Sequence, residues 1–308
     1  MMALLVSLLL AVALGWLAQR TGLCMVRAVQ GIRMWRPGLL LTIVGCGVWF
    51  WLASPLFIHF PLGEVLRRHA IGWPFAVGGL LFGLAAAVNH GCSISTLSAL
   101  ARGQWHMLAT ILGWVLGWWM LYLGAPDISY TRLTTTFTPA WWLVLSIVAV
   151  SLLAIWRLSP AHRRIYAGVM VFGAVGGLLG VLEPLWSPSQ LIRDVTERPL
   201  AMDMAVAWPS LGRVLISVAI LAGMLVAARA HFRPGEYQGS LWRWVKHLLA
   251  GIVMGIGASL ALGGNDLQLL IALPAGSPGA VVALICMIAG IWIGLAIEER
   301  WERRQDQD

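Results

Sequence analysis

Long apolar runs separated by short polar connectors recur along almost the whole chain. Nine such runs lie at about 3–17, 39–60, 73–88, 105–123, 141–156, 165–182, 211–228, 248–262 and 280–297. Most are long enough to cross the hydrocarbon core of a bilayer, about 30 Å thick, as a helix. A membrane β-barrel would show short alternating segments instead. The pattern therefore predicts an all-α polytopic membrane protein with about nine transmembrane helices.

Two of the apolar runs end in a polar, glycine-bearing break. The run 73–88 stops at Asn-His-Gly-Cys (89–92), and a short segment rich in Ser, Thr and Leu (93–101) follows. The run 248–262 stops at Gly-Gly-Asn-Asp (263–266), and the short segment 267–273 follows. A polar break at membrane depth is costly unless it lines a cavity or is buried in protein. We therefore expect two broken helices, each continued by a short re-entrant helix.

The two broken helices also resemble each other in sequence. Residues 79–91 (GLLFGLAAAVNHG) align with 251–263 (GIVMGIGASLALG) at an offset of 172, and three glycines coincide. The predicted crossings make the two helices run in opposite directions. The sequence thus predicts a single membrane domain with a first repeat at 1–160 and a second, inverted repeat at 161–308. Broken helices in inverted repeats form the substrate site of many transporters, although GxxxG glycines alone would also serve close helix packing.

Composition and charge support a membrane location and indicate an orientation. Charged residues make up 11% of the chain and the mean hydropathy is +0.81, whereas about 25% of a soluble domain is charged. The net charge of +8 comes from basic residues at the ends of apolar runs, so we expect no nucleic-acid partner. The basic connectors 20–36, 157–164 and 229–246 fall on one side, predicted to be the cytoplasm. We expect a multi-pass protein of the cell inner membrane with its N-terminus outside and its C-terminus cytoplasmic; the loop 61–72, with two arginines outside, is an exception.

The four cysteines divide into two groups. Cys46 and Cys286 lie inside apolar runs, as small core residues do. Cys24 and Cys92 each lie in a glycine-bearing polar break. The chain has no CxxC pair, no zinc-like spacing of Cys and His, and no cofactor motif. We therefore expect neither a metal nor a cofactor.

Three ordered segments resemble the YeeE/YedE sulphur transport family of membrane proteins. They are Gln-Arg-Thr-Gly-Leu-Cys (19–24), the broken helix 79–103 with Cys92 at the family's cysteine, and the second-half helix 251–264. The resemblance implies import of a thiosulphate-like anion, with Cys92 as the central thiol and Cys24 as a flanking one. It also implies a small cytosolic sulphur-carrier protein as a partner.

The chain departs from the family pattern at two positions. The family commonly has a third cysteine after the second-half Gly-Gly. An ungapped register places Gly264 there, and a shift by one residue places Asn265 there. Asn265 would replace the thiol as a neutral donor through its amide. The other departure is His90, where the family tends to have glycine or another small residue.

A substrate site at the bilayer midplane is therefore expected between the two breaks. Its predicted substrate-binding residues are Cys92, Cys24, His90, Asn265, Gly91, Ser93, Ser95 and Gly264. A thiol is a weak donor and a polarizable partner for sulphur, and the N-terminus of a half-helix suits an anion. His90 is either a partner of the thiol or a histidine satisfied by a backbone carbonyl. Asp266 is either a cap for the helix that follows or a residue of ion coupling.

Three functions fit these residues. The first is uptake of a small sulphur-containing anion, passed along cysteine thiols without being chemically changed. The second is a membrane thiol enzyme with Cys92 as nucleophile and His90 as base, against which no third orienting group is evident. The third is a membrane subunit that docks a cytosolic sulphur-carrier protein on the basic inner face. We expect the first, a transporter in the lipid bilayer and not an enzyme.

Overall fold

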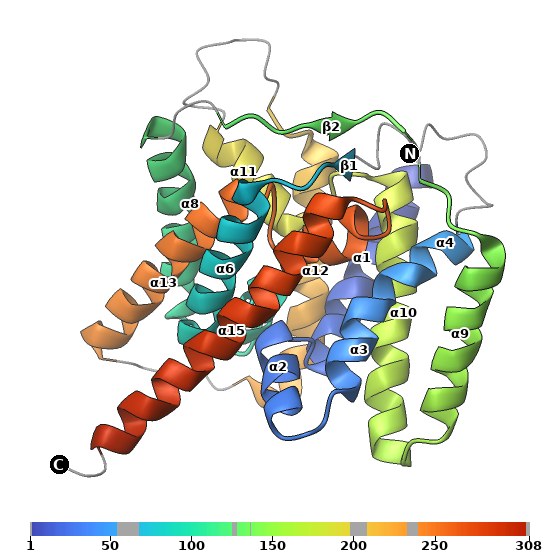
Figure 1. The fold of residues 1–308 in the computed structure, drawn as a ribbon, viewed down its shortest axis with the longest axis horizontal. Coiled ribbons are helices and arrows are strands. Elements are labelled where there is room, and N and C mark those ends of the chain that lie inside the picture. The colour runs from blue at the N-terminus through green and yellow to red at the C-terminus, as the bar shows by residue number, and fades with distance from the viewer. Residues whose placement is uncertain are drawn as a thin grey trace.

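The computed structural model describes residues 2–53, 68–124, 128–135, 137–197, 208–232 and 240–305, and these form a helical bundle (Figure 1). The α-helices are α1 (Met2–Thr21), α2 (Met25–Arg33), α3 (Gly38–Gly45), α4 (Trp49–Ala53), α6 (Trp73–Val88), α7 (Ser93–Ala101), α8 (Met107–Gly124), α9 (Trp141–Trp156), α10 (Pro160–Leu182), α11 (Pro188–Glu197), α12 (Leu211–Ala228), α13 (Leu241–Leu260), α14 (Asn265–Leu267) and α15 (Pro278–Gln305). The 3-10 helices η1 (Cys46–Val48) and η3 (Arg229–His231) and the π-helical turn η4 (Gln268–Ala272) complete the helical part. Strands β1 (Arg68–His69) and β2 (Arg132–Leu133) form one short antiparallel pair.

The prediction of an all-α polytopic membrane protein is confirmed. Within the described ranges, seven helical segments are long and apolar enough to cross a membrane. The apolar helices at the second and fifth predicted spans, Gly38–Leu52 and Trp141–Trp156, are shorter. Residues 54–60 of the second predicted span lie outside the described residues. Four predicted segments, 73–88, 93–101, 141–156 and 211–228, have the same bounds as α6, α7, α9 and α12.

Several connectors that the sequence analysis treated as irregular are helical. The basic stretch after Cys24 forms α2, and the polar stretch 183–209 contains α11. Helix α13 begins at Leu241, seven residues before the predicted span. Pro160 begins α10 rather than stopping a helix, because proline fits the first helical turn, where its missing N–H has no acceptor.

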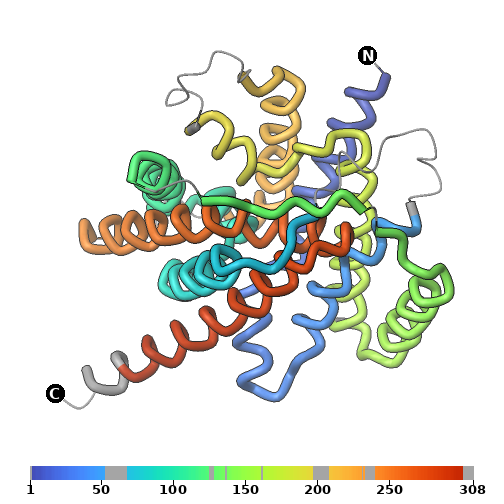
Figure 2. Tube along the Cα trace, turned by 45° about the horizontal axis from the view of Figure 1, so that its top comes forward, coloured from blue at the N-terminus to red at the C-terminus, as the bar shows by residue number. Residues whose placement is uncertain are grey.

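Glycine-lined contacts join the two halves of the chain. Helix α6 packs against α15, and α13 packs against α8 and α6; Figure 2 shows α13, α6 and α15 side by side. A side-chain carbon on Gly83 would overlap the carbonyl oxygen of Met287 in α15. One on Gly255 would overlap the carbonyl oxygen of Trp114 in α8. Each broken helix therefore packs against a long apolar helix of the other half, and glycine permits the close approach.

The bundle has two distinct ends (Figure 1). We call the end that carries β1, β2 and α11 the strand end, and the end that carries α2, the connector between α9 and α10, and the last turns of α15 the tail end. Helix α1 begins at the strand end, and α15 finishes at the tail end. Opposite ends for the two helices are what an odd number of crossings requires. Which end faces the cytoplasm stays a prediction.

Candidate functional site

The two breaks have matching backbone conformations at the offset of 172 residues. His90 in the first break has φ +55°, and Leu262 in the second has φ +60°. Both lie in the left-handed region, which is uncommon for residues other than glycine. Two residues later, Cys92 (φ −82°, ψ −174°) and Gly264 (φ −72°, ψ −178°) are both extended, and each is the N-cap of the helix that follows. The ungapped register therefore holds, and Gly264, not Asn265, is the structural equivalent of Cys92.

Both candidate thiols occupy N-cap positions. Cys92 is the N-cap of α7, and Cys24, with φ −153° and ψ 123°, is the N-cap of α2. Neither side chain caps its own helix. The two thiols instead lie close to each other, and Ser95 Oγ is 3.3 Å from Cys92 Sγ. Cys92 is 1% exposed and Cys24 is 9% exposed, so the fold forms a buried pair of free thiols.

The two breaks meet directly. Ser93, the first residue of α7, donates its hydroxyl to Asn265 Oδ1 at 2.6 Å, and its backbone N–H points to the same oxygen at 3.3 Å. These two residues are themselves 172 positions apart, so the contact joins equivalent points of the two breaks. Cys92, Asn265 and Asp266 line one cavity of about 10 Å³. Predicted residues 92, 93, 95, 24, 264 and 265 are thus gathered in one place.

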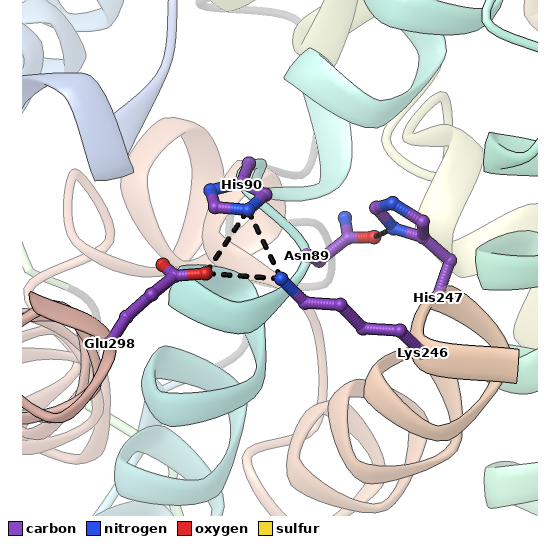
Figure 3. Close-up of polar contacts among 5 residues, drawn as sticks. All are labelled: Asn89, His90, Lys246, His247 and Glu298. Carbon is purple, nitrogen blue, oxygen red and sulfur yellow. Dashed lines mark hydrogen bonds and ion pairs between the residues drawn. The ribbon is translucent and has the colours of Figure 1, made fainter. Parts of the chain in front are cut away.

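His90 is not brought to the thiol. Its Nε2 lies 3.2 Å from Glu298 Oε1 in α15 and 3.2 Å from Lys246 Nζ in α13, and these two side chains pair with each other at 3.0 Å (Figure 3). The His90 side chain is about half exposed. We call these three residues the tail-end cluster. In the described part of the chain His90 makes no hydrogen bond with Cys92, so the structure does not support a base or proton partner for the thiol.

Asn89 holds the first break in shape. Its Oδ1 accepts a hydrogen bond from Thr110 Oγ1 at 2.6 Å and lies 2.8 Å from His247 Nδ1 (Figure 3). Its Nδ2 donates to the carbonyl of Gly91 at 3.0 Å and to Thr96 Oγ1 at 2.9 Å. The side chain is fully buried, so these bonds replace all of its contacts with water. Gly91, predicted as a site residue, contributes its carbonyl to this network.

Asp266 does not cap its own helix, because the N-cap is Gly264. Its Oδ1 lies 2.9 Å from Ser93 Oγ, and its Oδ2 accepts from Ser189 Oγ at 2.8 Å and from Ser187 Oγ. Ser187 and Ser189 lie at the start of α11. Neither serine was predicted as a site residue, because both fall in the polar stretch between two apolar runs. The carboxylate is 2% exposed.

A cavity of about 440 Å³ lies at the strand end beside the second break. Its lining includes Arg193 and Arg213, together with Gln190 and Gln268. Arg213 pairs with Asp194 at 2.7 Å. Nη2 of Arg213 and Oε1 of both glutamines are buried without a hydrogen-bonding partner among the described residues. We call this cavity the vestibule. Its lining carries two arginines, one carboxylate (Glu183) and neutral polar groups, and this excess of positive charge suits a small anion.

Tyr130 is a polar anchor near the vestibule. Its hydroxyl donates to the carbonyl of Leu260, at the end of α13, at 2.9 Å. Burial raises the pKa of Tyr130 above its ordinary value, and the nearby Arg193 offsets part of that rise. The phenol is therefore neutral at physiological pH and remains a hydrogen-bond donor.

Comparison with known families gives one match. A family model described as sulphur transport matches residues 122–293, more than half of the chain. The matched range contains the second break and the vestibule residues of α11, α12 and η4, whereas Cys24 and Cys92 precede it. A search of curated proteins finds no match to the chain.

Proposed function

Because the chain belongs to the sulphur transport family, as its motifs predicted, we propose that it takes up a small sulphur-containing anion, thiosulphate-like, across the cell inner membrane. The anion passes between the two broken helices, with Cys92 and Cys24 as neighbouring thiol stations. The single observation that carries this proposal is the direct contact between the breaks, Ser93 to Asn265, beside the buried thiol pair.

The chemistry of the site suits a sulphur anion. The N-terminus of α7 offers free N–H groups and the positive end of the helix dipole. The hydroxyls of Ser93 and Ser95 add donors within the same turn. A protonated thiol donates weakly and presents a polarizable sulphur, so it holds the terminal sulphur of such an anion without repelling its charge. Two thiols in contact allow a substrate to move between them with no bond formed or broken.

The vestibule supports a route to this site from the strand end. Its two arginines attract anions, and Gln268 lies in the turn that directly follows α14. We infer that the strand end faces outside, as the distribution of basic connectors predicts. Reporter fusions or labelling of single cysteines on either side of the membrane will test this orientation, which an N-terminus in the cytoplasm would contradict.

The site is closed in this conformation. A cavity of about 10 Å³ next to Cys92 holds no more than one water molecule, and a thiosulphate-like anion is larger. The substrate therefore reaches the thiols only after the packing between the two breaks opens. The Ser93–Asn265 contact is the polar part of that packing, and its two short helices are the elements that would have to move.

The other two functions receive less support. A thiol enzyme requires a base within reach of Cys92, and the ring of His90 contacts Lys246 and Glu298 instead. A docking subunit would use the tail end, where the tail-end cluster is exposed to a cytosolic partner. Docking of a small sulphur-carrier protein is compatible with transport, and it becomes the main proposal only if transport fails.

Uptake of ³⁵S-thiosulphate tests the proposal, in cells lacking other sulphur importers and in proteoliposomes. We expect Cys92→Ala to lower uptake at least tenfold and Cys24→Ala to lower it less. Cys286→Ala is the matched control, because this partly buried thiol lies on α15 and lines none of the cavities described above. Uptake by Cys92→Ala at the wild-type rate would overturn the thiol route.

Two further results would redirect the proposal. Wild-type protein that takes up neither thiosulphate nor persulphide or selenium compounds would favour the docking subunit. Chemical turnover of thiosulphate by purified protein in detergent would favour the enzyme.

A further inference from the structure

Asp266 is a buried carboxylate without a cationic partner in the described part of the chain. It is 2% exposed, and no arginine, lysine or histidine there lies within ion-pair distance of it. An ionised carboxylate at this depth is costly unless its charge is compensated. Its neighbours are hydroxyl and amide groups, which share hydrogen bonds with the charge but do not neutralise it.

The hydrogen atoms around Asp266 are too few for the contacts observed. Six oxygens take part: the two of Asp266, Oδ1 of Asn265, and the hydroxyls of Ser93, Ser187 and Ser189. They make five close oxygen–oxygen contacts, none longer than 2.9 Å. The three hydroxyls supply three hydrogens. Two of the five contacts thus have no hydrogen of their own and bring oxygens together that would otherwise repel.

We propose that this oxygen cluster is a binding site for a single sodium ion. A hard cation prefers oxygen ligands such as carboxylates, amide carbonyls and hydroxyls. One carboxylate balances one positive charge, so the bound pair is neutral, whereas a divalent ion would leave an excess charge in the bundle. Ser93, Ser189 and Asp266 form the polar edge of a cavity of about 20 Å³ whose other lining residues are mainly apolar. Its volume is that of one water molecule or one small ion.

The position of the cluster couples the cation to the substrate. Ser93 bonds Asp266 and is the residue after Cys92, and Cys92 and Asp266 line the same small cavity. An anion at the thiols would meet the negative charge of Asp266 at close range. A cation on Asp266 removes that repulsion, so each ligand strengthens the binding of the other. This inference rests on the proposed function for its consequence, but the cation site itself stands without it.

The location also follows the general layout of cation-coupled transporters. Coupling ions bind where broken helices expose backbone and polar groups near the midplane. Here the starts of α7, α11 and α14 converge on one carboxylate. Sodium would therefore connect three helices that are otherwise held together at this point by hydroxyl contacts.

The first test measures cation binding without any substrate. Purified full-length protein is heated in Na⁺, K⁺ or choline at equal ionic strength, and its unfolding midpoint is recorded. We expect Na⁺ alone to raise the midpoint by at least about 3 °C, and Asp266→Asn and Ser187→Ala to abolish or reduce the rise. Ser98→Ala is the control, because this buried hydroxyl on α7 contacts Met224 instead. If Asp266→Asn does not fold, Ser187→Ala, which keeps the carboxylate, decides the question.

The second test measures coupling in proteoliposomes with imposed gradients. We expect an inward Na⁺ gradient to accelerate ³⁵S-thiosulphate uptake at least fivefold in wild type and Ser98→Ala but not in Asp266→Asn. Uptake that responds to a pH gradient and not to a Na⁺ gradient would overturn the sodium site and indicate that Asp266 binds a proton instead. Equal unfolding midpoints in all three cations, with normal uptake, would refute the sodium site and leave the proposed function intact. A Na⁺-dependent midpoint with no uptake of thiosulphate would support the sodium site and refute the proposed function.

Discussion

Gly264 is the position where a single methyl group tests the geometry of the site. A Cβ at this residue would lie 2.7 Å from Asp266 Oδ1, while Ser93 Oγ and Ser189 Oγ would be at 3.6 Å, an ordinary contact. The backbone angles, φ −72° and ψ −178°, suit any residue, so strain is not involved. Gly264→Ala should therefore destabilise the protein through a single steric clash, between the new methyl group and Asp266 Oδ1.

The loss of stability caused by Gly264→Ala depends on how firmly Asp266 Oδ1 is held by its neighbours. Overpacking a fixed site costs about 1–3 kcal/mol. If Oδ1 moves away instead, the contact is relieved and the cost is a weakened hydrogen bond to a charged group, about 1.5–3 kcal/mol. Replacing glycine by alanine at an N-cap costs about 1 kcal/mol more. We expect Gly264→Ala to lower the free energy of unfolding by about 3 kcal/mol in wild type but by only about 1 kcal/mol when Asp266 is alanine.

A double-mutant cycle measures this difference. Gly264→Ala, Asp266→Ala and the pair are unfolded by denaturant in detergent micelles, and the coupling free energy should be about 2 kcal/mol. Gly45→Ala is the control in both backgrounds, because a Cβ there has nothing within 4 Å and alanine favours the helix. A coupling free energy below about 0.5 kcal/mol would refute the close approach of Gly264 and Asp266.

Three further substitutions test other parts of the structure. Asn89→Ala should lower the free energy of unfolding by about 2–4 kcal/mol in the same titration, because it leaves buried polar partners unpaired. Arg213→Gln should raise the half-saturation concentration for thiosulphate about fivefold, about 1 kcal/mol, at an unchanged maximal uptake rate, because it removes a charge from the vestibule. Tyr130→Phe should cost about 1 kcal/mol at neutral pH. Since the pKa of Tyr130 is raised in the folded state, this difference persists below about pH 10 and shrinks as the pH rises through the folded-state pKa.

The broken helices could be predicted from the sequence because their signals are local. The apolar run 73–88 ends where Asn-His-Gly-Cys begins, and α6 and α7 have the predicted bounds. The glycine offset of 172 also relates the two breaks, although the sequence left open whether Gly264 or Asn265 corresponds to Cys92. Extended without a gap, the offset pairs Ser93 with Asn265, and these two side chains are in contact. A repeat in the sequence thus carried information about a long-range contact.

Other elements could not be predicted because their stabilising contacts lie far away in the chain. Helix α2 carries basic residues and looks like a connector, but Arg33 pairs with Glu299, 266 residues later. Helix α11 has too few apolar residues to stand out as one of the apolar runs of the sequence. Its first serines bond Asp266, 77 and 79 residues away. No local period encodes such contacts, so the oxygen cluster is visible only in the folded chain.

The close approach of Asp266 to Gly264 leaves no room for a thiol in the second break. Gly264 is the structural equivalent of Cys92, and any side chain there, cysteine included, would meet Asp266. The two breaks therefore have the same backbone conformation but different side chains: the first presents a thiol, and the second presents a carboxylate two residues further on.

The two breaks also face opposite ends of the bundle, since His90 belongs to the tail-end cluster and Leu262 lines the vestibule. An anion that crosses from one end to the other must pass the contact between them, where an uncompensated Asp266 would repel it. The proposed cation on Asp266 would remove this repulsion, and three serine hydroxyls surround the carboxylate that would bind it.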